Sequence, residues 1–228
     1  PGSDHAPADV VLGQPDFGSE GPAAGGRGAA NGLNLPTGVA VIDGRLFVCD
    51  AWHHRLLIWN AVPQRSDQPP DVVLGQPDFT EVRENSGGEA SALSFYWPFG
   101  LAYIDGWFWV ADTGNRRVLG WQGTPEPGRT PDVLLGQSTY TDRSENRGGA
   151  VSGSSFRWPH AIAGDAEVLY VADAGNHRVL GWAPHPRADR PADLALGQAT
   201  FAASDELPHR PQGPQRLRRR RVEVAEHR

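Results

Sequence analysis

An aspartate and an arginine recur five positions apart at three places in the sequence. The pairs are Asp50 with Arg55, Asp112 with Arg117, and Asp173 with Arg178. An aspartate in a turn accepts backbone N–H groups, and a nearby arginine can pair with it through several donors. Because the three pairs share one phase, we interpret all six residues as structural ones that close a turn, rather than as catalytic residues.

Other residues with chemical potential stand where equivalent positions of the sequence differ. Histidine can ligate a metal or accept a hydrogen bond, whereas exposed aromatic residues and arginine dominate the energy of protein interfaces. No His-x-x-x-His pair and no cluster of carboxylates accompanies these residues, so we predict no catalytic and no metal-ligating set. The predicted binding-face candidates are Trp52, His53, Phe99, Arg157 and His160.

The composition excludes several kinds of site. All 21 basic residues of the 228-residue chain are arginine, so a Schiff-base or P-loop lysine is impossible. A single cysteine rules out a cysteine zinc cluster and a disulfide framework. Cys49 stands where the other copies have Ala111 and Ala172, which predicts a small buried residue. No run of about 18 apolar residues exists, so we expect no membrane-spanning segment.

The charge is distributed unevenly along the chain. The formal net charge is −6, but residues 1–206 contain 14 arginines against 25 acidic residues, a net charge of −11. An acidic body argues against a nucleic-acid partner, because phosphate binding requires clustered cations. The arginine-rich segment 207–228 is either a genuine basic element or the product of a reading-frame error in its coding sequence.

These residues sit in a sequence that repeats itself. The tripeptide Leu-Gly-Gln begins at Leu12, Leu74, Leu135 and Leu196, at steps of 62, 61 and 61 residues. A period of this length is typical of stacked structural repeats, and finding it determines the fold class. The Asp/Arg pairs keep the same phase, so they occupy one equivalent place in every unit.

Within one unit the pattern predicts short strands separated by turns. Asp105-Gly106 is a hairpin signal between two apolar segments, and Asp112–Asn115 supplies a second turn. Four antiparallel strands per unit without helical periodicity are typical of a β-propeller blade. The strands predicted for the second unit are residues 100–104, 107–111, 116–121 and 131–137.

One motif carries a family resemblance. Residues 171–179 read Val-Ala-Asp-Ala-Gly-Asn-His-Arg-Val, and residues 112–118 nearly repeat the end of that pattern. The pattern resembles the NHL repeat, from which the first copy departs at His53 and Leu56. The resemblance, to a bacterial-type protein, implies an all-β propeller of six blades. It also implies an interaction platform, since NHL repeats mostly have that role, although similar propellers include lyases and lactone hydrolases.

The period also predicts how much of such a ring is present. The chain holds about three and a half of the six expected blades, with blades over residues 1–206 and the start of a further blade over residues 207–228. Residues 9–14 are expected as the outermost strand of a preceding blade. Missing blades or a second copy would be needed to close the ring. The lack of methionine indicates a fragment, and no targeting segment is recognisable, which leaves the compartment open.

Phased tryptophans and glycines complete the predicted blade. Trp59, Trp121 and Trp182 are expected to fill the gaps between blades, with Trp97 and Trp158 doing the same at the entry to the inner strands. Paired glycines in the connections of about 20 residues between blades can cradle an anion, but a tight turn is the better interpretation. Loops of that length usually carry function.

Two functions from different classes follow from these features. The first is a non-enzymatic scaffold that binds a protein or peptide through its long-loop face and needs no cofactor. The alternative is a lyase or lactone hydrolase with a divalent cation at the mouth of the central channel. A catalytic zinc needs about three protein ligands, and His160 is the one histidine expected on an inner strand. We therefore prefer the first function.

Overall fold

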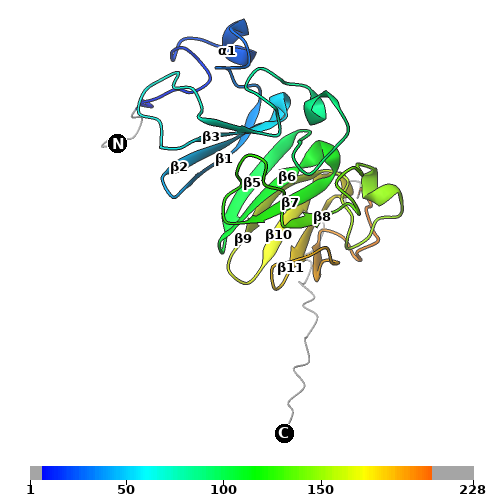
Figure 1. Ribbon diagram of the computed structural model, residues 1–228. Helices are drawn as coiled ribbons and strands as arrows, with labels where there is room; N and C mark the ends of the chain where they lie inside the picture. The colour runs from blue at the N-terminus through cyan, green and yellow to red at the C-terminus, as the bar shows by residue number, and fades with distance from the viewer. Residues whose placement is uncertain (1–6, 207–228) are drawn as a thin grey trace.

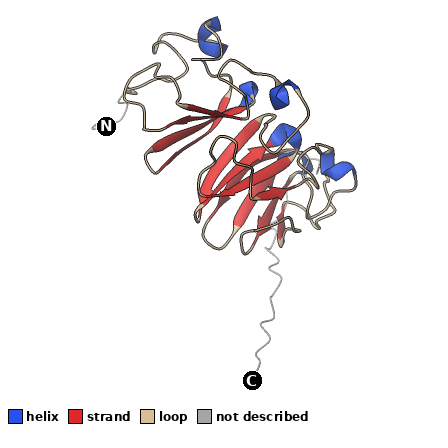
Figure 2. Cartoon of the chain, in the orientation of Figure 1, coloured by secondary structure: helices blue, strands red, loops and turns tan. Residues whose placement is uncertain are grey.

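The computed structural model of the chain describes residues 7–206, which form an arc of three all-β blades (Figures 1 and 2). Each blade is a sheet of four antiparallel strands in chain order. The helical turns between them are five residues long or shorter, so no helix in this range could cross a membrane. The further blade expected over residues 207–228 lies outside the described residues.

The same elements recur in each blade. The first contains β1 (Pro36–Ile42), β2 (Arg45–Asp50), β3 (Arg55–Trp59) and β4 (Val72–Leu74). The second contains β5 (Pro98–Ile104), β6 (Trp107–Asp112), β7 (Arg117–Gln122) and β8 (Val133–Leu135), and the third β9 (Pro159–Gly164), β10 (Leu169–Asp173), β11 (Arg178–Trp182) and β12 (Leu194–Leu196). The short helical turns are α1 (Pro22–Gly26), η1 (Ala51–His53), η2 (Glu84–Gly87), η3 (Thr113–Asn115), η4 (Glu145–Gly148) and η5 (Ala174–Asn176).

The middle blade shows why its strands read as almost continuous apolar runs. β6 is buried along its whole length, because neighbouring blades cover both of its faces. Phe108 and Trp121 share one buried cluster with Phe47 of the first blade, whereas Trp109 shares another with Trp182 of the third. Alternate residues of each strand therefore face opposite neighbours, and Trp121 and Trp182 fill the gaps between blades as predicted.

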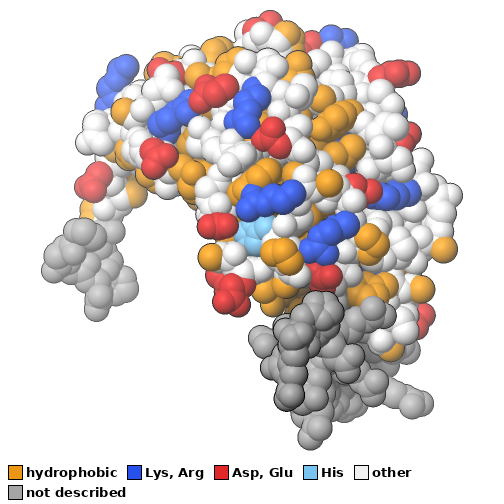
Figure 3. Space-filling model, turned by 60° about the horizontal axis from the view of Figure 1, so that its bottom comes forward, with side chains coloured by type: hydrophobic (Ala, Val, Ile, Leu, Met, Phe, Trp, Pro, Cys, Tyr) orange, Lys and Arg blue, Asp and Glu red, His pale blue; other side chains and the backbone are white. Residues whose placement is uncertain are grey.

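The two ends of the arc differ. The free face of the first blade is covered by the chain itself, since Leu12 and Leu33 pack on Trp59. On the far face of the third blade, Tyr170 and Val179 are only half-buried. The sheets of residues 7–206 do not close into a ring. Figure 3 shows the arched outline and interspersed apolar, basic and acidic side chains on the side that forms the bottom of Figure 1.

Two details of the predicted strands are wrong. Residues 9–14 form no strand; the Val11 carbonyl instead accepts the Asp67 N–H (2.9 Å), because no sheet of a preceding blade lies beside them within residues 7–206. The fourth strand is also shorter than predicted, since Pro131 has no N–H to donate and Gly136 takes a left-handed backbone (φ 90°).

The inner strands β1, β5 and β9 lie side by side and approach closely at a glycine. A Cβ atom at Gly100 would collide with the carbonyl oxygen of His160 on the next blade. The equivalent residues are Gly38 and Ala161, and Ala161 is exposed on the last described blade. Glycine is thus required at Gly100, where the next blade packs against it. Alanine stands at position 161, against which no following blade within residues 7–206 packs.

We predict that Gly100→Ala lowers the free energy of unfolding by about 1–3 kcal/mol, because the added methyl group overpacks the junction. The matched exchange Ala161→Gly should cost under about 1 kcal/mol, the entropic cost of glycine in a strand. Urea unfolding of the purified variants measures both. Equal losses for the two variants would contradict close packing at Gly100.

Candidate functional site

The helical turns gather on one side of the strands (Figure 2). We call this side the loop face: it holds η1, η3 and η5, which join the second and third strands, and the long loops between blades, which contain α1, η2 and η4. All predicted binding residues lie in or next to these segments. What keeps them in place is the Asp/Arg pair of each blade.

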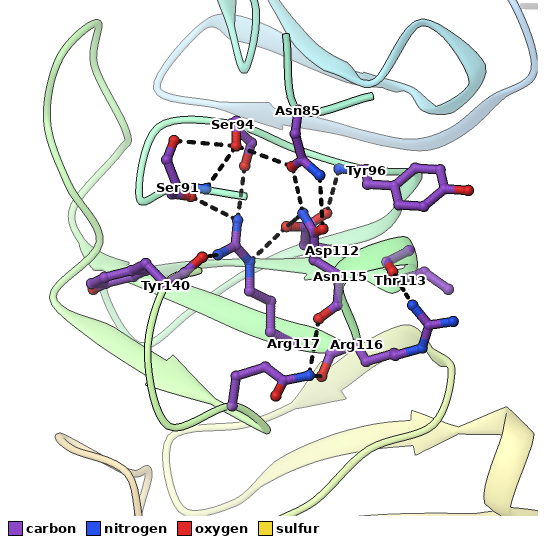
Figure 4. A network of polar contacts seen from close by, with 12 residues as sticks. Asn85, Ser91, Ser94, Tyr96, Asp112, Thr113, Asn115, Arg116, Arg117 and Tyr140 are labelled. Atoms are coloured by element: carbon purple, nitrogen blue, oxygen red, sulfur yellow. Dashed lines mark hydrogen bonds and ion pairs between the residues drawn. The ribbon is translucent and has the colours of Figure 1, made fainter. Parts of the chain in front are cut away.

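In the middle blade the pair is the centre of a buried polar network (Figure 4). The Arg117 Nε donates to Asp112 Oδ2 at 2.7 Å, and both side chains are fully buried. The remaining donors of Arg117 bind the carbonyls of Ser91, Ser94 and Tyr140 at 2.7–2.9 Å. Because Ser91 and Tyr140 belong to the loops before and after the blade, one guanidinium fastens both long loops to the sheet.

The other two blades repeat this arrangement at equivalent atoms. Asp50 and Arg55 pair at 2.7 Å, and Asp173 and Arg178 at 2.9 Å. Arg55 also binds the carbonyls of Ala29, Gly32 and Phe79, and Arg178 those of Ser152, Ser155 and Phe201. The long loops of residues 7–206 are therefore held by buried charge-assisted hydrogen bonds and are not free at their bases.

His53 is buried inside this network and does not lie on the surface predicted for it. Its Nδ1 lies 2.8 Å from Asp50 Oδ2, and the residue is only 5% exposed. In the second blade Asn115 donates to the equivalent carboxylate oxygen, Asp112 Oδ2. It also exchanges two hydrogen bonds with Asn85 (2.9 and 3.1 Å). The first copy has Ala23 in place of Asn85. His53 and Ala23 thus stand where the second blade has the paired side chains of Asn115 and Asn85. The prediction that His53 is a binding-face residue is wrong, because its side chain is buried.

The paired glycines make tight turns. Asn85, Ser86 and Gly87 all have a left-handed backbone (φ 49°, 57° and 77°), and residues 146–148 repeat this conformation. The N–H groups of Asn85, Ser86 and Gly88 donate to protein carbonyls at 2.9–3.1 Å. Three of the four N–H groups of residues 85–88 are thus occupied, which favours a tight turn over an anion nest.

Two predicted binding-face residues, Trp52 and Arg157, are exposed near a blade entry or turn, and so is Trp158. Trp52, in η1, is 53% exposed. Arg157 is also exposed and lies over the ring of Trp158, with its central carbon 5.9 Å from the ring centroid. Trp158 itself is 46% exposed, so the prediction that it fills a gap between blades is wrong.

Phe99 and His160 meet at the inner rim of the arc. Their rings, on the neighbouring strands β5 and β9, stack in parallel with centroids 4.9 Å apart and an interplanar angle of 6°. Both are half-buried, and burial lowers the pKa of His160. Sequence reasoning named both residues but did not place them in contact.

The residue after each helical turn was missed as a contact point between blades. His54, Arg116 and His177 occupy it, all with a left-handed backbone. The Trp97 N–H donates to His54 Nδ1 at 3.2 Å, which links the first blade to the second. At the next junction Arg116 replaces His54, and its side chain has no acceptor atom. The N–H of Trp158, the counterpart of Trp97, lies instead 3.4 Å from Asp173 Oδ1. The signal in the sequence was the change of residue type at one phased position.

No group of three or more histidine, cysteine, aspartate or glutamate side chains within residues 7–206 is arranged to hold a metal ion. Cys49 is fully buried, as predicted, and burial raises the pKa of its thiol. The loop face of these residues combines displayed aromatic and arginine side chains with a rigid base, an arrangement suited to binding.

A comparison with protein-family models agrees with the repeat. Residues 33–59, which cover β1 to β3, match the model of the NHL repeat. The chain is similar to the solved structure of a luciferin-regenerating enzyme, with 14% sequence identity and a TM-score of 0.34, over 72% of this chain and 63% of that one. No curated protein sequence matches the chain. The chain carries an NHL repeat in its first blade and repeats that blade twice within the described residues.

We predict that Arg117→Leu lowers the free energy of unfolding by about 3–5 kcal/mol, because it leaves Asp112 buried without its partner. The matched control is Arg129→Leu. Arg129 pairs with Asp132 at the same 2.7 Å distance, but both side chains are more than a third exposed, so the loss should stay under about 1 kcal/mol. Urea unfolding compares the two, and similar losses would contradict an anchoring role for Arg117.

His54 and His160 should make the chain less stable as the pH decreases from 7.5 to 5. Burial lowers the pKa of His54 and of His160 below the value of about 6.5 expected in the unfolded chain. At these two residues the unfolded state then binds protons first, so their contribution to stability is full above about pH 6.5 and is lost as the pH falls through the folded values.

The variant His54→Asn tests the share of His54 in this pH dependence. Asparagine keeps an acceptor for the Trp97 N–H and tolerates a left-handed backbone, but it does not titrate. The melting temperature of the variant should change less between pH 7.5 and 5 than that of the unaltered chain. The same slope in both proteins would show that His54 does not take up the proton.

Proposed function

We propose that the chain is a non-enzymatic NHL-repeat scaffold that binds a protein or peptide through its loop face. The observation that carries the proposal is the display of two tryptophans there: Trp52 is 53% exposed, and Trp158, which lies beneath Arg157, is 46% exposed. The phased tryptophans of the third strands, such as Trp121, are buried instead. Tryptophan and arginine are the residues most enriched among interface hot spots, because a large flat side chain loses water on binding.

The base of this surface supports the proposal. The Trp52 N–H donates to the Asn34 carbonyl at 3.0 Å, and the Trp158 carbonyl accepts the Ala174 N–H at 2.9 Å. Both backbone positions are thus held before a partner arrives. A preordered surface loses less conformational entropy on binding, so more of the contact energy appears as affinity.

The alternative function, a metal-dependent lyase or lactone hydrolase, would have one imidazole ligand at the inner rim of residues 7–206. This is the side chain of His160, whose ring stacks on Phe99. A catalytic metal site needs several ligands that converge on one point. We therefore do not propose a lyase or hydrolase activity.

The test is a selection of peptides from a displayed random library on the purified chain, followed by calorimetry with the peptides recovered. Trp52→Ala and Trp158→Ala should each weaken binding about ten-fold or more, the effect of losing a hot spot. Tyr103→Ala is the matched control, because Tyr103 is an exposed aromatic residue near the opposite end of β5. Peptides that bind the two tryptophan variants as tightly as the unaltered chain would exclude the proposed surface.

A further inference from the structure

A cavity of about 760 Å³ opens on the loop face between the second and third blades. Two arginines and two glutamates line it, and they come from three separate segments of the chain. Tyr96 contributes an aromatic ring to the lining, and three residues of η4 also line the cavity. The lining residues are Glu84, Tyr96, Arg116, Arg143, Ser144, Glu145, Asn146, Gly148 and Gly149.

Glu84 and Glu145 occupy one phased position of the repeat, but Tyr96, Arg116 and Arg143 do not recur. At the junction between the first and second blades, the positions equivalent to Glu84, Tyr96, Arg116 and Arg143 hold Pro22, Asn34, His54 and Val82. The backbone has the same conformation at one of these positions: φ is 56° at Arg116 and 55° at His54. The fold of the blade therefore does not require Tyr96, Arg116 and Arg143, and another reason is needed for these three side chains.

The two ion pairs between lining residues are loose, although Glu145 also lies 3.2 Å from Arg157, outside the lining. Arg116 lies 3.6 Å from Glu145, and Arg143 lies 3.5 Å from Glu84, compared with 2.7–2.9 Å for the buried Asp/Arg pairs. The Arg116 Nε is shielded from solvent and has no hydrogen-bond partner, while its NH1 donates to the Gly114 carbonyl at 2.6 Å. One edge of this guanidinium thus keeps donors without a close acceptor.

The charge balance selects a type of ligand. The lining presents two positive and two negative side chains, so its complement carries both signs. A ligand with net negative charge would be repelled by the acidic body, whereas a zwitterion has no net charge to repel. Burial and the charge of Glu84 raise the pKa of Tyr96, so its hydroxyl stays protonated beside the site. Figure 4 shows Tyr96 and Arg116 extending toward the same side of the network.

We propose that this cavity binds a zwitterionic ligand of the α-amino-acid type. The ligand carboxylate is held by Arg116 and Arg143, and its ammonium group is held by Glu84 and Glu145. Both contacts are charge-assisted hydrogen bonds, which are stronger than the exposed ion pairs that they replace. The site adjoins the proposed partner-binding surface, because Glu145 pairs with Arg157 (3.2 Å), which lies over Trp158.

The test is a calorimetric titration at low ionic strength with four probes: glycine, triglycine, acetate and methylammonium. Glycine should bind at least about ten-fold more tightly than either singly charged probe, because each of those makes only one of the two contacts. Comparable binding of triglycine would identify peptide ends as a source of the ligand, and preference for glycine would identify free amino acids. Acetate that binds as tightly as glycine, or no saturable binding of glycine and triglycine, would overturn the proposal.

Two variants locate the site. The triple variant Tyr96→Asn, Arg116→His, Arg143→Val installs the residues that the chain itself carries at the first junction, and it should lose glycine binding about ten-fold or more while keeping its melting temperature. His54→Arg, at the equivalent position of the first junction, is the control and should leave binding unchanged. Glu145→Gln should weaken glycine binding. Tighter binding to that variant would show that Glu145 competes with an anion and would overturn the zwitterion assignment.

Discussion

The buried Asp/Arg pair at the end of each second strand is the interaction on which the rest of the structure depends. Removing a carboxylate and a guanidinium from water is expensive, and it is tolerated only when every donor and acceptor finds a partner. Here the arginine meets this demand by binding the carboxylate and three loop carbonyls, as Arg117 does with Asp112. The need to satisfy one buried charge pair thus fixes long loops that have almost no regular structure of their own.

Packing between blades imposes the second constraint. Each interior strand must present apolar side chains on both faces, and the inner strands must come close enough for Gly100 to lie against the backbone of His160. These demands repeat with the blade and explain nearly every phased residue. Functional side chains are therefore found among the positions that differ from one blade to the next, since the fold leaves those positions free.

The loop face shows this division most clearly. Arg116, Tyr96 and Glu84 occupy positions where the first junction has His54, Asn34 and Pro22, without a change in the course of the chain. The same scaffold thus links two blades through a histidine acceptor at one junction and opens a charged cavity at the next. A repeat protein can vary its surface in this way, because each junction contacts only its own neighbours.

The sequence by itself determined the period, the four-stranded blade and the place of the Asp/Arg pairs, because these depend on local turn chemistry and on patterns repeated in phase. It also identified the positions that break the repeat. Only the tertiary structure decided what those positions do: His53 is buried against Asp50, Trp158 is displayed, and Phe99 stacks on His160. The physical reason is that exposure depends on neighbours far away along the chain, such as Gln76, which donates to the carbonyl of His53, and no local pattern encodes those contacts.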